Sequence, residues 1–241
     1  MPSNPQTKLI FDIETVGENW SDLDKTTQDS LTSWIEREAS DKDEYNRLLD
    51  DIKNGLGFSP LTGEIVAVGV LDFDKDKGGV YYQSPKVKND RFEEDGVTFE
   101  ALDEEGILRK FWDLASRYNV FVTFNGRGFD VPFLMARSAI KKVMPTKNLM
   151  VSRYLYQQHA DAIHIDLLDQ LSFQGAVRRK GSLHLWCRAF GIKSPKSEGI
   201  TGDDVNLLFK KKKYLEIAKY NAGDLRATKQ LFEMWNTYFN I

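Results

Sequence analysis

The sequence predicts an α/β protein in which helices flank a mixed β-sheet. Three strand patterns lie in the first part of the chain, up to residue 83. From residue 104 a helix, a strand and a second helix follow one another, and the rest of the chain is mostly helical. This order is typical of a sheet covered by helices. No internal repeat divides the chain, so we expect a single domain, 1–241, with a helical insertion at about 15–60.

The first half of the chain carries three predicted strands. Residues 8–14 alternate and are rich in Ile and Phe, which is typical of a strand. Residues 64–73 are a second strand. A polar turn at 72–79 then leads into a third strand that begins at 80–83, and this spacing indicates a hairpin.

The connection between the first two strands, residues 15–60, is too long for an ordinary loop. Helix-compatible stretches occupy residues 29–39 and 43–53, so we interpret the connection as a helical insertion. Residues 18–53 contain 11 acidic and 5 basic side chains, a net charge of −6. A lid over a functional site and a surface decoration both fit this pattern.

The middle of the chain continues with alternating helices and strands. Apolar residues at helical spacing predict a helix over 104–118. A short apolar run predicts a buried parallel strand at 120–124. A helix over 131–143 follows, with Pro132 in its first turn. Residues 163–168 fit either a fifth strand or the start of a helix.

The last part of the chain is predicted to be helical. Ser182 is an expected N-cap, and Gly191 is an expected C-terminal stop of the same helix. Residues from 203 onward are predicted to form two helices that meet near 218–223.

Composition excludes several classes of protein. With 41% hydrophobic and 29% charged residues, the chain is not a disordered polymer. A single cysteine, Cys187, excludes an internal disulfide framework and a cysteine-cluster zinc site. The longest apolar stretch, 65–71, is too short to span a membrane, and residues 1–8 do not form a signal segment. We therefore expect a soluble, cytoplasmic protein with no membrane partner.

The net charge of −3 is unevenly distributed along the chain. Residues 137–196 contain 11 basic and 3 acidic side chains, a net charge of +8. Such a segment can present a face that attracts a polyanion. Ordinary solvated surface charge is the alternative interpretation.

Four carboxylates are candidate metal ligands. Asp12 and Glu14 lie two residues apart on a predicted strand, so both leave the same face. Their repulsion and desolvation would demand a cation or a raised pKa, unless they lie at a solvated strand end. Asp130 follows a predicted strand, where ligand sites of open α/β sheets gather, although it would also serve as an N-cap.

Tyr220 and Asp224 are four residues apart in a predicted helix and therefore share one face. In isolation they would be a half-buried tyrosine beside a solvated aspartate. Taken with the other three carboxylates, however, Asp224 completes a set of oxygen ligands from three segments. Four such ligands suit hard divalent cations such as Mg²⁺ or Mn²⁺ better than zinc.

Three segments resemble, in order, the exonuclease motifs of the DEDD 3′–5′ exonucleases: residues 11–15 (Phe-Asp-Ile-Glu-Thr), 124–130 (Phe-Asn-Gly-Arg-Gly-Phe-Asp) and 220–224 (Tyr-Asn-Ala-Gly-Asp). The resemblance spans almost the whole chain and is strongest to the stand-alone bacterial and viral group related to the proofreading domain of family B DNA polymerases. It implies a ribonuclease H-like fold, a five-stranded mixed sheet with the first strand central. The tyrosine subclass is indicated, because Tyr220 lies four residues before Asp224 and Lys219 occupies the position of the histidine subclass.

The resemblance also implies a mechanism. Asp12, Glu14, Asp130 and Asp224 would hold two divalent cations, Mg²⁺ or Mn²⁺, around the terminal phosphodiester. Tyr220 would orient the attacking water or the phosphate, since a phenol with an ordinary pKa of about 10 is a poor base near neutral pH.

Further residues are expected to contact the nucleic acid strand. Asn125 and Phe129 are predicted to touch the terminal nucleotides, with Thr15 near the 3′ end, although Phe129 is equally well explained as a core residue. A basic loop is a candidate guide for the strand; it comprises Arg178, Arg179 and Lys180.

We therefore expect a 3′–5′ exonuclease that converts single-stranded DNA to nucleoside 5′-monophosphates. One alternative is an exoribonuclease, because the same metal chemistry serves both sugars. The other is a catalytically silent nucleic-acid-binding module on the same fold. No polymerase sequence follows on this chain, so a polymerase or repair partner would act in trans.

Overall fold

The structure of the protein, a computed structural model, describes residues 6–85, 90–194 and 202–240. The polar residues 1–5 and part of the basic segment 137–196 lie outside these ranges. Among the described residues, no helix combines the length and the apolar character needed to cross a membrane.

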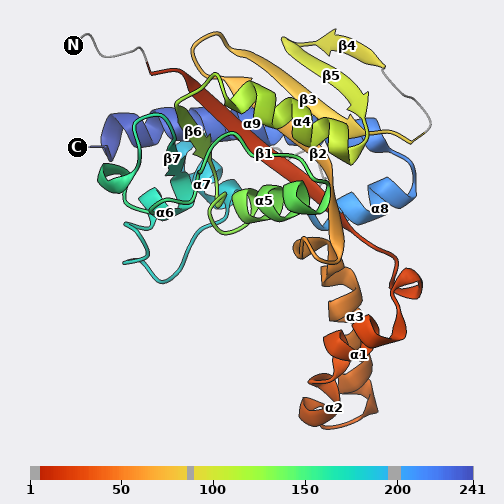
Figure 1. The fold of residues 1–241 in the computed structure, drawn as a ribbon. Helices are drawn as coiled ribbons and strands as arrows, with labels where there is room; N and C mark the ends of the chain where they lie inside the picture. Colours follow the sequence, from red (N-terminus) through yellow and green to blue (C-terminus); the bar gives the residue numbers. More distant parts are fainter. Residues whose placement is uncertain (1–5, 86–89, 195–201, 241) are drawn as a thin grey trace.

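One mixed sheet forms the centre of the described part of the chain (Figure 1). Its strands are β1 (Lys8–Gly17), β2 (Gly63–Asp72), β3 (Lys77–Gln83), β4 (Arg91–Glu94), β5 (Val97–Leu102), β6 (Val120–Thr123) and β7 (Ile163–Asp166). They lie in the order β4-β5-β3-β2-β1-β6-β7. β1 pairs antiparallel with β2 and parallel with β6, so the predicted mixed sheet is confirmed.

Within the described ranges the sheet has seven strands rather than the expected five. The expected five-stranded arrangement is present as β3-β2-β1-β6-β7, with β1 in the middle, and β5 and β4 extend it beyond β3. The buried alternation of Val97, Phe99 and Ala101 is a strand signal that the sequence analysis overlooked. β4 gives no such signal, because only one of its four residues is apolar.

Helices cover both faces of the sheet. The helices of the described residues are α1 (Lys25–Thr32), α2 (Ile35–Glu38), α3 (Lys42–Gly55), α4 (Glu104–Ala115), α5 (Asp130–Ile140), α6 (Leu167–Leu171), α7 (Leu183–Phe190), α8 (Val205–Lys210) and α9 (Tyr214–Tyr238), with short 3-10 turns η1 (Trp20–Asp22), η2 (Leu56–Phe58), η3 (Leu155–Gln157) and η5 (Gly202–Asp204). Figure 1 shows α4 and α5 in front of the sheet and α9 behind it.

β1 is buried between these two helical layers, and its side chains alternate between them. Leu9, Phe11 and Ile13 pack in a core cluster with residues of α4 and α5. Ile10 packs instead with residues of α9. The face that carries the even-numbered residues of β1 therefore looks toward α9, as the alternation of a strand requires.

The C-terminal helices differ from the prediction. α9 is one continuous helix, and the break lies before it, at residues 211–213, rather than near 218–223. Lys212 has a φ of 62° in this break. Gly223 does not interrupt α9, because packing of the helix along the sheet outweighs the low helix propensity of one glycine. The lysines at 210–213 thus span a helix end and a turn rather than one helix.

Other local predictions are confirmed. Residues 163–168 contain both alternatives, because β7 ends at Asp166 and this residue caps α6 by accepting hydrogen bonds from the N–H groups of Leu168 and Asp169. Ser182 caps α7, and Gly191 ends it in the left-handed conformation.

The connection between β1 and β2 forms the three helices α1, α2 and α3, which extend away from the sheet in Figure 1. Asp24 and Asp41 cap α1 and α3. The long connection is therefore helical, as predicted. Its description as an insertion into a single domain stays a prediction.

Candidate functional site

Three acidic side chains from two elements meet between β1 and α9. One carboxylate oxygen each of Asp12, Glu14 and Asp224 lies within 4.8 Å of the others. Glu14 is buried and the other two are half-buried, so the pair on β1 does not lie at a solvated strand end. The register between β1 and β2 shifts directly after Glu14, an irregularity of the kind that re-aims side chains near active sites.

Burial and mutual repulsion dominate the electrostatics of this cluster. Desolvation is the main cause that raises the pKa of Asp12 well above its ordinary value, and the charges of Asp130, Asp224 and Glu14 raise it further. Desolvation and the charge of Asp224 likewise raise the pKa of Glu14. A bound proton or cation would therefore stabilise the cluster.

Asp130 lies beside this cluster but outside the group of three. It is the first residue of α5, it is buried, and its Oδ1 accepts a hydrogen bond from the N–H of Ile13 at 3.1 Å. Desolvation raises its pKa to about 7. The N-cap interpretation is wrong, because Phe129 occupies the N-cap position and Asp130 uses its carboxylate to bind β1.

Asn221 is a residue of this site that the sequence analysis missed. Its side chain is fully buried, and its Nδ2 donates a hydrogen bond to Asp12 Oδ2 at 2.8 Å. Hydrogen bonding by Asn221 also opposes the rise in the pKa of Glu14. Its position directly after Tyr220 in the third motif was the signal that could have identified it.

Gly69 of β2 makes room for Asn221. A Cβ atom at Gly69 would lie 1.9 Å from Asn221 Oδ1 and 2.8 Å from a methyl carbon of Leu225. The glycine therefore permits α9 to approach the sheet closely at the carboxylate cluster. A glycine inside a strand is a general signal of such a close approach, but the partner is set by the fold.

Tyr220 reaches the same group of carboxylates. Desolvation raises the pKa of its phenol above the ordinary value, and the charges of Asp224, Glu14 and Asp12 raise it further. A hydrogen bond to Asp224 acts in the same direction. The phenol thus stays neutral and can act as a hydrogen-bond donor but not as a base at neutral pH. Tyr220 also lines a pocket of about 620 Å³ between α9 and strands β4 and β5.

The predicted strand-contacting residues near β1 and α5 have protein contacts of their own. Thr15 Oγ1 donates a hydrogen bond to the carbonyl of Gly57 at 2.7 Å, so its hydroxyl is engaged inside the protein. Asn125 is exposed and has a φ of 66°. Phe129 is half-buried against the core, with its ring next to those of Phe133 and Phe58.

The predicted basic loop lies in the exposed segment between α6 and α7 and comprises Arg178, Arg179 and Lys180. Lys180 lines a pocket of about 290 Å³ together with Asn125, Arg127 and Arg153. Arg127 and Arg153 were not predicted as site residues. Both pair with Asp169, so their charge is partly neutralised. The second motif contains Arg127, whereas nothing in the sequence singles out Arg153.

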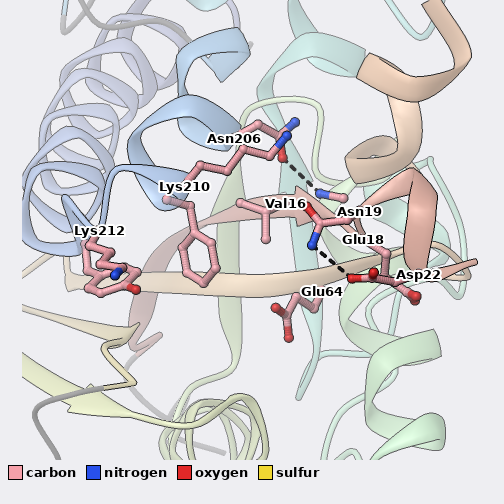
Figure 2. Close-up of a pocket in the computed structure, with 11 residues that line it drawn as sticks. Val16, Glu18, Asn19, Asp22, Glu64, Asn206, Lys210 and Lys212 are labelled. Atoms are coloured by element: carbon pink, nitrogen blue, oxygen red, sulfur yellow. Dashed lines mark hydrogen bonds between the residues drawn. The ribbon is translucent and has the colours of Figure 1, made fainter. Parts of the chain in front are cut away.

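A separate pocket of about 390 Å³ lies where β1 ends, and Figure 2 shows its lining. Acidic side chains line one part of it and lysines another, and Asn206 Oδ1 accepts a hydrogen bond from the N–H of Gly17 at 3.0 Å. The charged lining residues are Glu18, Asp22, Glu64, Lys210 and Lys212. None of the predicted site residues lines this pocket, so it is distinct from the carboxylate cluster.

Comparison with known proteins gives a consistent picture. The model of a family described as "predicted 3′–5′ exonuclease related to the exonuclease domain of PolB" matches residues 64–238. This match includes Asp130, Tyr220 and Asp224 but begins after Asp12 and Glu14.

Similar proteins come from archaea. DNA polymerase 1 of Sulfolobus acidocaldarius is 26% identical over 183 residues, which cover 73% of this chain and 21% of the polymerase. DNA polymerase 1 of Saccharolobus solfataricus is 23% identical over 179 residues, 69% of this chain and 20% of the polymerase. The chain thus spans about a fifth of the length of these relatives.

A solved structure shares the fold. The family B DNA polymerase of the hyperthermophilic archaeon Pyrobaculum calidifontis aligns with a TM-score of 0.58 and 18% identity, and the alignment covers 97% of this chain and 25% of the polymerase. The likeness confirms the predicted fold class, a ribonuclease H-like mixed sheet flanked by helices.

Proposed function

Because the chain belongs to the family of predicted 3′–5′ exonucleases related to the exonuclease domain of PolB, we propose that it is an active, metal-dependent 3′–5′ exonuclease. It hydrolyses single-stranded DNA from the 3′ end and releases nucleoside 5′-monophosphates. The observation that carries the proposal is the convergence of Asp12, Glu14 and Asp224 within 4.8 Å, with Asp130 beside them.

The donor set fits divalent cations. Desolvation and mutual repulsion disfavour the charged forms of Asp12 and Glu14, and a cation removes that penalty. Oxygen-only ligands suit Mg²⁺ and Mn²⁺. Asp12, Glu14, Asp130 and Asp224 would hold two such ions. When bound, the ions lower the pKa of a water molecule and stabilise the charge that develops on the phosphate and the leaving oxygen.

The chain's own residues orient the groups that react. Tyr220 keeps its proton because burial and the neighbouring carboxylates raise its pKa. When substrate binds, its O–H turns from Asp224 and donates a hydrogen bond to the attacking water or to the phosphate. Asn221 holds Asp12 in place through its amide. Ile13 holds Asp130 through its backbone N–H. These contacts fix the carboxylates before substrate binds, and groups that hydrogen-bond to metal-binding side chains commonly support a metal site in this way.

DNA is the favoured substrate, because the similar archaeal proteins are DNA polymerases. Matched DNA and RNA oligonucleotides, digested side by side with Mg²⁺ and then with Mn²⁺, test this preference. Faster loss of the RNA would indicate an exoribonuclease instead. A polymerase or repair complex is the partner we propose, since the relatives carry this region within a polymerase chain.

The decisive experiment compares linear and circular single-stranded DNA of the same sequence. We expect stepwise shortening of the linear strand from its 3′ end, release of 5′-monophosphates, and an intact circle. Asp12→Ala is the inactive control. Degradation of the circle would indicate internal cutting. Binding of the linear strand without any product in Mg²⁺ or Mn²⁺ would indicate a catalytically silent binding module.

A further inference from the structure

Phe58, at the end of the helical connection between β1 and β2, exposes a large apolar ring next to the candidate site. It is 62% exposed, and Leu61 in the following turn is 77% exposed. Exposed apolar groups that lie together commonly mark a binding surface. Neither residue was singled out by the sequence.

The turn that carries Phe58 is fixed to the strand that carries Asp12 and Glu14. Thr15, the residue after Glu14, donates its hydroxyl hydrogen bond to the carbonyl of Gly57, the residue before Phe58, at 2.7 Å. A Cβ atom at Gly57 would lie 2.9 Å from the backbone nitrogen of Gly17, so the two backbones are in close contact. The position of Phe58 relative to the carboxylates is therefore set by direct contacts with β1.

The turn is also anchored by its own neighbours. Leu56 is 3% exposed, and its carbonyl accepts a hydrogen bond from Thr62 Oγ1 at 2.8 Å. The ring of Phe58 projects from a turn whose other residues are buried. A rigidly held aromatic ring loses little conformational entropy when it binds a ligand.

The ring of Phe58 also contacts the residue that precedes α5. Its ring centre lies 6.5 Å from that of Phe129, in an edge-to-face arrangement at 68°. Phe129 directly precedes Asp130, whose carboxylate binds the N–H of Ile13. The contact between the two rings thus joins the turn that is bonded to β1 with the start of α5.

The charge around the connection argues for a base rather than a phosphate as the partner of Phe58. Residues 18–53, in the helical connection that ends with the turn of Phe58, carry a net charge of −6. Phosphate groups are repelled there, whereas the uncharged face of a base is not. Stacking on an aromatic ring is the usual way in which proteins hold single-stranded bases without reading their sequence.

We propose that Phe58 stacks on a base near the 3′ end of the single-stranded substrate and, together with Phe129, forms the aromatic wall of the substrate site. The helical connection thus contributes a substrate-contacting residue to the site. This inference rests on the proposed exonuclease function.

The test uses single-stranded DNA with the fluorescent base 2-aminopurine at each of the last four positions in turn. Binding is measured in the Asp12→Asn background, so that the strand stays intact. We expect stacking to quench one position, Phe58→Ala to abolish that quenching and weaken affinity by about 10-fold, and Phe58→Trp to retain both. Tyr238→Ala is the matched control, because Tyr238 is 66% exposed at the far end of α9 and should affect neither quantity.

Two results would overturn the inference. One is equal quenching and affinity in Phe58→Ala and in the Tyr238→Ala control. The other is weaker binding with no position-specific change in fluorescence. Failure of the proposed function is a separate outcome, since the protein without substitutions would then leave linear DNA intact whatever the fluorescence shows.

Discussion

Asn221 Nδ2 and Asp12 Oδ2 lie 2.8 Å apart and join residues that are 209 positions apart in the sequence. The donor lies on α9 and the acceptor on β1, and the donor side chain is fully buried. This hydrogen bond fixes the orientation of a carboxylate whose neighbours repel it. It therefore links the packing of α9 against the sheet to the geometry of the candidate metal site.

Removal of this donor should weaken the site. Asn221→Ala leaves Asp12 without its amide partner, and loss of such outer-shell contacts typically costs 10–100-fold in metal affinity or activity. A Mn²⁺ titration of exonuclease activity measures both quantities. Asn236→Ala, an exposed asparagine on the same helix, is the control and should leave the titration unchanged. Activity and Mn²⁺ dependence in Asn221→Ala that match those of the control would contradict the prediction.

Gly69→Ala should disturb the same contact from the opposite side. The added methyl group would lie 1.9 Å from Asn221 Oδ1, so either the buried Asn221 side chain or α9 must shift away from β2. Overpacking of this kind typically costs 1–3 kcal/mol of the free energy of unfolding. Gly79→Ala on β3 is the control, because nothing lies closer than 3.6 Å to its added atom. Urea unfolding of both variants gives the comparison, and equal midpoints would refute the close-approach argument.

Tyr220→Phe and Asp12→Ala should separate positioning from metal binding. The phenylalanine variant loses one donated hydrogen bond, so turnover should fall by up to about 100-fold but remain measurable. The alanine variant loses a proposed metal ligand and should show no turnover. Single-turnover rates on a 3′-labelled oligonucleotide measure both. Complete loss in Tyr220→Phe with unchanged metal binding would refute a positioning role.

The stability of the metal-free protein should fall as the pH rises. The pKa of Asp130 is raised from its ordinary value of 3.8 to about 7, so the folded state binds this proton more tightly than the unfolded state. Its contribution to stability is full below pH 3.8 and is lost as the pH rises through about 7.

Asp130→Asn isolates this contribution, because the amide keeps an oxygen for the N–H of Ile13 but does not ionise. In EDTA, the Tm of the variant relative to that of the original protein should increase between pH 4 and pH 8. For a chain of this size, about 1 kcal/mol corresponds to about 2–4 °C. Mn²⁺ should reverse the difference at pH 8 by stabilising the charged carboxylates. A pH-independent difference in Tm would contradict the raised pKa of Asp130.

The sequence by itself determined the residues of the candidate chemistry and the faces on which they lie. A strand of alternating residues places Asp12 and Glu14 on one side, and a helix places Tyr220 and Asp224 a turn apart, because these periods are fixed by the backbone. The two strands that extend the sheet beyond β3 were missed because β4 is short and charged, and because the alternation in β5 was overlooked.

Only the tertiary structure decided which distant groups meet. The approach of Asn221 to Gly69, the bond from Thr15 to Gly57, and the contact of Phe58 with Phe129 all join different elements. Local periodicity says which face a side chain leaves, but not which element packs against that face or how closely. Those distances follow from the packing of α9, α5 and the helical connection around β1, and that packing depends on the whole core at once.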